Sequence, residues 1–189
     1  WIGCAKISPG CANCYASVET FTRVERGKGR ELWGVDAERH ITGEGNWTKP
    51  VVWNKKAAAL NERHRVFCAS LADVFEDRSE LIDPRHRLML LIESTPNLDW
   101  LLLTKRPQNI GEMVPVKWFE DGFPNNVWLG TSVENQEQAD KRIPELLGIP
   151  AKVRFLSCEP LLGAVDLSKW IWIGPKEGKV QTYSEIDWV

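Results

Sequence analysis

Short apolar runs rich in β-branched and aromatic residues recur along the chain after residue 60, and their spacing constrains the fold more than any other feature. Their starts lie roughly 26 to 34 residues apart, which leaves room for a helix in each gap. This repeat predicts βα units and a parallel sheet. The runs cover residues 66–71, 100–104, 127–133 and 153–158, with a further strand beginning near Ile186.

Two of the gaps carry clear helix signals. Asp83 followed by Pro84 predicts an N-cap and a first helical residue. Apolar residues then recur at helical spacing in both gaps, at Leu88, Leu91 and Ile92 and at Ala139, Ile143, Leu146 and Leu147.

No Gly-x-Gly-x-x-Gly turn follows any predicted strand, which favours a βα barrel over a doubly wound sheet.

We expect a single domain, because 189 residues suffice to bury one core. It divides into a cysteine-rich segment (1–27), an irregular glycine- and tryptophan-rich excursion (28–53) and the βα repeats (60–189). The last strand is cut short, so we expect an incomplete barrel whose C-terminal part is missing. An odd number of cysteines without a signal peptide, and the lack of a long apolar stretch, favour the cytoplasm and no membrane partner.

Charged side chains follow three neighbouring strands at the point where each predicted strand ends. Lys105 and Arg106 follow the second strand, Glu134 follows the third and Glu159 follows the fourth. The carboxyl ends of parallel strands in a βα barrel form one mouth, where such folds build their sites. Isolated charges at that place need a partner or a ligand. The sequence therefore predicts one polar site at this edge.

Three cysteines near the start of the chain, Cys4, Cys11 and Cys14, form a candidate ligand set. Three thiolates on one iron–sulfur cluster leave one iron without a protein ligand, and that iron can bind a small molecule. The Ser8-Pro9-Gly10 turn bends the chain between the first two cysteines. A zinc site completed by a histidine, a disulfide and three structural thiols are the open alternatives.

Five segments in order resemble the phage-type three-Cys-motif proteins, a family of phages and bacteria without a settled function that is similar to radical S-adenosylmethionine enzymes. The resemblance implies a radical-SAM-like partial βα barrel in which Cys4, Cys11 and Cys14 hold a 4Fe–4S cluster. The open iron would chelate the methionine end of S-adenosylmethionine. Six residues separate Cys4 from Cys11, unlike the Cys-x3-Cys spacing of the main radical enzymes. The matching segments are residues 3–16, 70–75, 103–107, 128–136 and 154–163.

On this resemblance the chain is a radical-type enzyme that takes an electron from an external donor and acts on an unknown substrate. Lys105 and Arg106 would then hold a carboxylate or phosphate. Glu134 and Glu159 would accept hydrogen bonds from ribose hydroxyls or the methionine amine. Tyr15 would shield the cluster.

Two other classes of function stay open. Glu134 and Glu159 could form the acid and nucleophile pair of a glycosidase-like barrel hydrolase, although this leaves the cysteines unexplained. A zinc-stabilised module could bind nucleic acid through the basic stretch at residues 23–30 and exposed tryptophans. A net charge of −2 and a pI near 6.0 give no global attraction to phosphate backbones.

Overall fold

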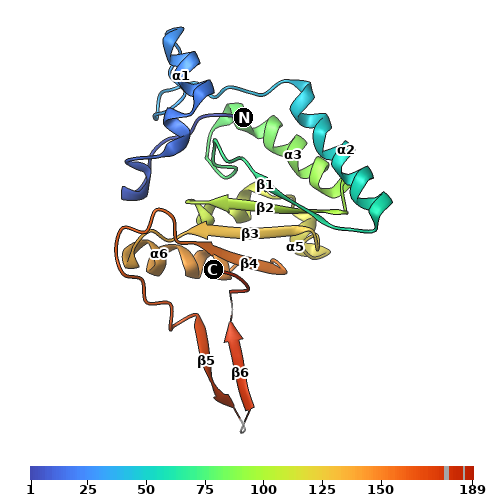
Figure 1. The fold of residues 1–189 in the computed structure, drawn as a ribbon, viewed down its shortest axis with the longest axis vertical. Helices are drawn as coiled ribbons and strands as arrows, with labels where there is room; N and C mark the ends of the chain where they lie inside the picture. The colour runs from blue at the N-terminus through green and yellow to red at the C-terminus, as the bar shows by residue number, and fades with distance from the viewer. Residues whose placement is uncertain (177–178, 185) are drawn as a thin grey trace.

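The computed structural model describes residues 1–176, 179–184 and 186–189 and contains a parallel sheet of four strands (Figure 1). The strands lie side by side in chain order, and each neighbouring pair is parallel. The prediction of an α/β fold with a parallel sheet is therefore confirmed. The strands are β1 (His64–Cys68), β2 (Leu98–Thr104), β3 (Val127–Ser132) and β4 (Val153–Ser157).

Among the described residues the sheet does not close into a barrel. β1 and β4 are its edges, and four strands cover only part of the circumference of a barrel of about eight strands. Past β4 the chain adds one parallel bridge between Phe155 and Trp188, supported by a 2.9 Å hydrogen bond from Leu156 N to Trp188 O. The strand predicted near Ile186 is represented by this bridge alone.

Helices fill the gaps between the strands, as the spacing predicts. α3 (Ile82–Ser94) joins β1 to β2, and α6 (Gln136–Leu147) joins β3 to β4. The N-cap prediction for Asp83 is wrong, because the 3-10 turn η3 (Ser79–Leu81) runs directly into α3 and its cap position is Leu81. Three shorter elements join β2 to β3, namely η4 (Pro107–Asn109), α4 (Ile110–Met113) and α5 (Lys117–Glu120).

The core lies between the sheet and these helices. Successive side chains of a strand point to opposite faces of its sheet, and one face carries Trp100, Leu102 and Leu129. All three are buried in one cluster with Ile92 of α3 and Ile143 of α6. Full burial of each leucine or isoleucine contributes roughly 1.5 to 3 kcal/mol, so this packing is the main stabilisation of the sheet.

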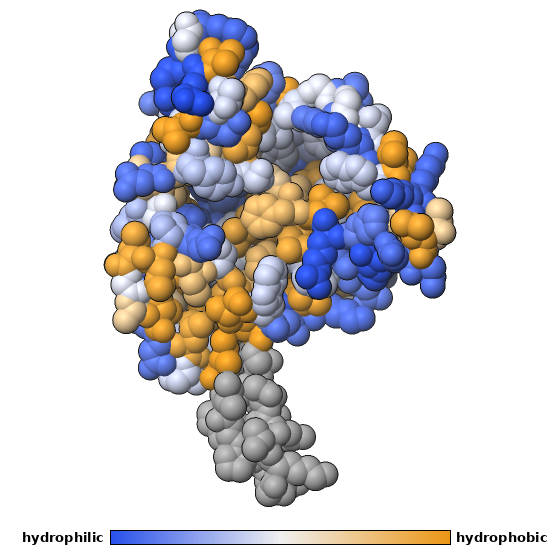
Figure 2. Space-filling view, viewed as in Figure 1, coloured by the Kyte–Doolittle hydropathy of each residue, from blue (hydrophilic) through white to orange (hydrophobic). Residues whose placement is uncertain are grey.

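The opposite face of the sheet is more open. It carries Phe67, which is half exposed, and Leu103 and Trp128, which are partly exposed. Figure 2 shows apolar surface, in orange, over the middle of the molecule where the sheet lies. On this face Gly130 pairs with Phe155, and a Cβ built on Gly130 would lie 2.3 Å from Cζ of that ring. The Phe155 ring therefore lies directly over the glycine.

Gly130→Ala is expected to lower the free energy of unfolding by about 1 to 3 kcal/mol, because the new methyl group overlaps a ring that is itself buried. Urea unfolding of both proteins measures the difference. The double variant Gly130→Ala/Phe155→Leu should regain part of the loss, because leucine removes the ring atoms that clash. Equal stability of Gly130→Ala and the parent chain would contradict the described packing.

The segment before β1 is more helical than the sequence indicates. α2 (Glu44–Leu60) occupies residues 44–53 of the predicted irregular excursion 28–53, and that prediction is wrong there. The helix contains Gly45 and Pro50, which are unfavourable inside helices. It buries only Pro50 and Ala57, and such a helix has no apolar stripe that the sequence could show. The other elements before β1 are η1 (Pro9–Cys11), η2 (Tyr15–Val18) and α1 (Thr20–Gly27).

After β4 the described chain forms an antiparallel hairpin instead of another βα unit. Its strands are β5 (Ile171–Lys176) and β6 (Lys179–Ser184), and the hairpin extends away from the sheet (Figure 1). The prediction of βα repeats over residues 60–189 therefore holds only as far as β4. No helix in the described part of the chain combines the length and apolarity needed to cross a membrane.

Candidate functional site

The first residues of the chain lie beside the loop that follows β1. Gly3 forms a parallel bridge with Ala72, and its N–H donates to Leu71 O at 2.9 Å. Gly3 has a φ of 109°, and a Cβ there would lie 2.2 Å from the carbonyl oxygen of Leu32. Both observations require glycine at this position. The path of the backbone into Cys4 is thereby fixed.

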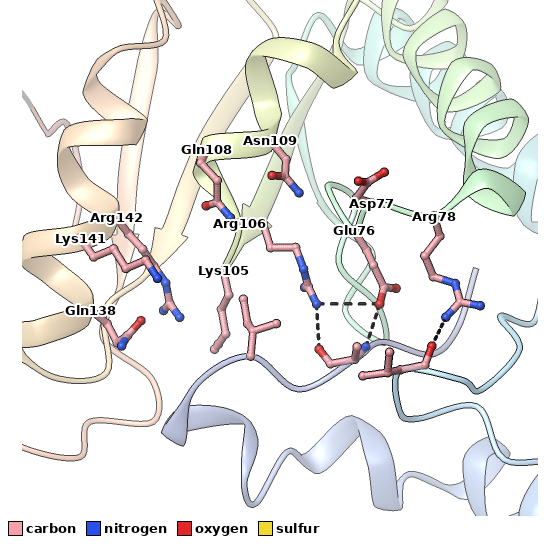
Figure 3. A pocket seen from close by; sticks show the side chains of 13 residues that line it. Glu76, Asp77, Arg78, Lys105, Arg106, Gln108, Asn109, Gln138, Lys141 and Arg142 are labelled. Carbon is pink, nitrogen blue, oxygen red and sulfur yellow. Dashed lines mark hydrogen bonds and ion pairs between the residues drawn. The ribbon is translucent and has the colours of Figure 1, made fainter.

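Glu76 is the first of two buried carboxylates that hold the cysteine-bearing segment. Its two oxygens accept from Arg39, from Nε at 2.8 Å and from Nη2 at 2.7 Å, and Oε1 also accepts from Ala5 N at 2.9 Å. The side chains of Arg39 and Glu76 are 0% and 4% exposed. Arg106 Nη2 donates to Ala5 O at 2.8 Å (Figure 3). Both polar backbone groups of the residue after Cys4 are therefore held by buried charges.

Glu134 is the second of these carboxylates and holds the turn before Cys11. Its Oε1 accepts from Ser8 Oγ and from Gly10 N at 3.4 Å, and its Oε2 accepts from Arg142 Nη1 at 2.7 Å. Burial raises the pKa of Glu134, but the hydrogen bonds from Ser8 and Arg142 and the charge of Arg142 outweigh it, so the net pKa is lowered. Glu134 is therefore ionised at neutral pH.

The cysteine-bearing segment, which Glu76 and Glu134 hold, borders a cavity of about 580 Å³, which we call the cysteine cavity. Cys4, Cys11 and Cys14 all line it. Residues from the carboxyl ends of all four strands line it as well, as expected for a site built at this edge of a parallel sheet. They include Ala69, Ser70, Lys105, Arg106, Ser132, Ser157 and Glu159.

Cys4 lies against a buried ion pair at the edge of this cavity. Arg106 Nη1 is 2.8 Å from Asp73 Oδ2 and 3.5 Å from Cys4 Sγ. Burial raises the pKa of Cys4 to about 12, although the positive charge of Arg106 opposes the shift. The free thiol is therefore protonated at neutral pH, and binding of a metal would displace that proton.

The described residues do not form a ready-made site for a single metal ion. No group of three or more His, Cys, Asp or Glu side chains in the described ranges has the arrangement that one metal ion requires. A zinc ion needs its sulfur ligands about 2.3 Å from one centre, so the zinc alternative gains no support. All five cysteines are free, which removes the disulfide alternative from this structure.

The other predicted site residues divide into two groups. Tyr15, Lys105 and Glu159 line the cysteine cavity together with Arg106. Tyr15 is 64% exposed, and its hydroxyl donates to Ser70 O at 2.8 Å. Lys105 Nζ donates to Ser132 Oγ at 2.9 Å. Glu159 has no hydrogen-bond or ion-pair partner within the described residues, so its carboxylate is available to a ligand.

Glu134 is the exception among the predicted residues. It is fully buried, it does not line the cysteine cavity and its charge is paired with Arg142. It lies just after β3, as the sequence predicts, but its role in the structure is to hold the cysteine segment. The glycosidase-like alternative also loses its support here, because Glu134 and Glu159 do not line a common cavity.

The sequence did not reveal several residues that shape the site. Glu76, Arg39 and Arg142 carry the buried contacts described above, and all three side chains are buried. The one available signal was the charge of Glu76 directly after Val74 and Phe75, since an ionised group beside an apolar run needs a partner. The identity of that partner depends on the tertiary fold.

The basic stretch that favoured nucleic acid is largely paired with local carboxylates. Arg26 pairs with Glu31, and both Lys28 and Arg30 pair with Glu25. These two carboxylates reduce the positive charge that would attract a phosphate backbone. The structure therefore adds no support to a nucleic-acid interface at residues 23–30.

A comparison with protein families gives one match along the entire chain. A family model described as "Protein of unknown function (DUF5131)" matches residues 1–189. Neither the curated proteins nor the solved structures contain a match.

Proposed function

We propose that this chain, which belongs to the DUF5131 family of proteins of unknown function, binds a 4Fe–4S cluster and acts as a radical S-adenosylmethionine-like enzyme. One observation carries the proposal. Cys4, Cys11 and Cys14 line a single cavity, and charged residues at the ends of the parallel strands line the same cavity. A set of three cysteine ligands leaves one position of a cluster open.

The residues of the chain have distinct tasks in this proposal. Cys4, Cys11 and Cys14 hold the cluster, which supplies one-electron reduction of the sulfonium cofactor when an external donor provides the electron. Lys105 and Glu159 present opposite charges to the same cavity, and this arrangement suits the carboxylate and amine of a methionine moiety. Tyr15 covers the cavity beside Cys14 and limits access of water.

Anaerobic reconstitution with iron and sulfide tests the proposal. We expect the parent chain to bind about four irons per chain and to show charge-transfer absorption and a reduced-state electron paramagnetic resonance signal. Cys4→Ser, Cys11→Ser and Cys14→Ser should each lose most of the iron and the signal, because each removes one of three ligands. Cys68→Ser and Cys158→Ser are matched controls and should keep both, since neither cysteine lines the cavity.

Two outcomes would overturn the proposal. Iron retained by the triple serine variant would mean that the cysteines are not the ligands. One equivalent of zinc, bound more tightly than iron and lost in the same variants, would favour the zinc-stabilised module instead. Calorimetric titration of the reconstituted chain with S-adenosylmethionine then separates the two cases. A radical-type enzyme should bind it, whereas a cluster with a different role should not.

A further inference from the structure

We propose that a second cavity binds the phosphate group of a small polar ligand. This cavity has a volume of about 410 Å³ and borders the cysteine-bearing segment at Ala5 and Ile7 (Figure 3). Its volume lies in the range of small-molecule sites. Ala5, Lys105 and Arg106 line both cavities, so the two share a wall. The inference does not depend on the proposed cluster.

The lining is strongly charged, and the cations outnumber the carboxylates. Five cationic side chains and two carboxylates, Glu76 and Asp77, line the cavity, so the lining has an excess of three formal positive charges. Figure 3 shows Lys141 and Arg142 coming from α6 and Lys105 and Arg106 from the loop after β2, on facing sides of the cavity. The cationic side chains are Arg78, Lys105, Arg106, Lys141 and Arg142.

Three of these cations are held in place from outside the cavity. Each guanidinium group is paired with a carboxylate that does not line it: Arg78 with Glu80, Arg106 with Asp73 and Arg142 with Glu134. These pairs fix the guanidinium groups and partly neutralise them. Arg106 also donates to Ala5 O and Arg78 to Val35 O, so part of their hydrogen-bonding capacity is already used.

The remaining positive charge is carried by two lysines. Lys141 has no hydrogen-bond or ion-pair partner in the described part of the chain, and the Lys105 ammonium donates to Ser132 Oγ, which lines the cysteine cavity and not this one. The amide of Gln108, which also lines the cavity, has no partner there either. The exposed Asp77 is the one uncommitted carboxylate.

This combination favours a phosphate group over a carboxylate. A phosphate monoester carries close to two negative charges at neutral pH, which suit a lining with more cations than carboxylates, and its three oxygens can accept several hydrogen bonds. A carboxylate has one charge and two oxygens, so it offers fewer acceptors to the donors that line this cavity. We therefore infer that the ligand is a phosphate monoester whose phosphate binds Lys141, while the Lys105 ammonium stays on Ser132 in the cysteine cavity.

Isothermal titration calorimetry of the full chain with inorganic phosphate and with ribose 5-phosphate tests this site at constant ionic strength. Both probes should bind, and acetate should not. A tighter interaction with ribose 5-phosphate would identify an ester as the ligand, whereas equal binding would identify the free anion. Lys141→Met should weaken phosphate binding at least about tenfold, because a charge-assisted contact is lost. Asp77→Asn should tighten it about two- to fivefold by removing a like charge.

Lys117→Met is the matched control, because Lys117 lies on α5 at the opposite end of the strands and pairs with Glu93. It should leave phosphate binding unchanged. No heat with either phosphate probe would overturn the proposal, as would equal affinity of the parent chain and Lys141→Met. The same titration before and after cluster reconstitution separates this site from the proposed function, since failure to bind iron leaves the phosphate result intact.

Discussion

Replacing Glu76 with leucine is expected to lower the free energy of unfolding by about 3 to 5 kcal/mol, because it leaves the charge of Arg39 buried without its partner. The Arg39 side chain is completely buried, and it loses both of its hydrogen bonds to the carboxylate. The Ala5 N–H loses its acceptor at the same time. Chemical denaturation monitored by tryptophan fluorescence measures the difference.

A surface pair provides the control for this experiment. Arg78 and Glu80 also form an ion pair, but their side chains are 21% and 40% exposed. Glu80→Leu should cost no more than about 1 kcal/mol, because water screens and replaces the lost contact. The double variant Glu76→Leu/Arg39→Met should regain much of the loss, since it removes both buried charges. A loss no larger than that of Glu80→Leu would show that the buried pair is not formed.

The parallel sheet could be predicted from the sequence because its signal is local. Each strand is a short apolar run, and α6 shows both a cap at Asn135 and an apolar stripe through Ala139 and Ile143. α2 could not be predicted, because it packs through only two buried residues and has no apolar face that the pattern could reveal. Local pattern is informative only where an element buries a continuous face.

The location of the candidate site can be predicted from the sequence, but the roles of its residues can be predicted only in part. Lys105 and Glu159 line the cavity predicted at the ends of the strands. Glu134 follows the same pattern in the sequence, yet it points to Ser8 and Arg142. Strand ends give the edge at which a side chain lies, whereas the choice between ligand and internal partner depends on distant residues. The separation of 126 positions between Ser8 and Glu134 illustrates this limit.

Glu134→Ala is expected to lower the free energy of unfolding by about 3 to 5 kcal/mol, because Arg142 would remain buried with an unpaired charge. The substitution also frees Ser8 and Gly10, and therefore the turn that leads into Cys11. If the cluster is bound as proposed, the iron content after reconstitution should fall even under conditions in which the variant is fully folded. Unfolding in urea and iron analysis of the folded fraction measure the two effects separately.

The pH dependence of stability distinguishes the charge of Glu134 from its size. The pKa of this carboxyl is lowered from its usual value of 4.5, so its contribution is fully present above that pH and is lost as the pH falls through the lowered pKa. Glu134→Gln keeps the shape and an acceptor for Ser8, but it removes this titration. The stability difference between the parent chain and Glu134→Gln should therefore be largest near neutral pH and shrink in acid. A difference that is constant with pH would mean that Arg142 does not depend on the ionised carboxylate, and the buried pair would not be what holds the cysteine turn.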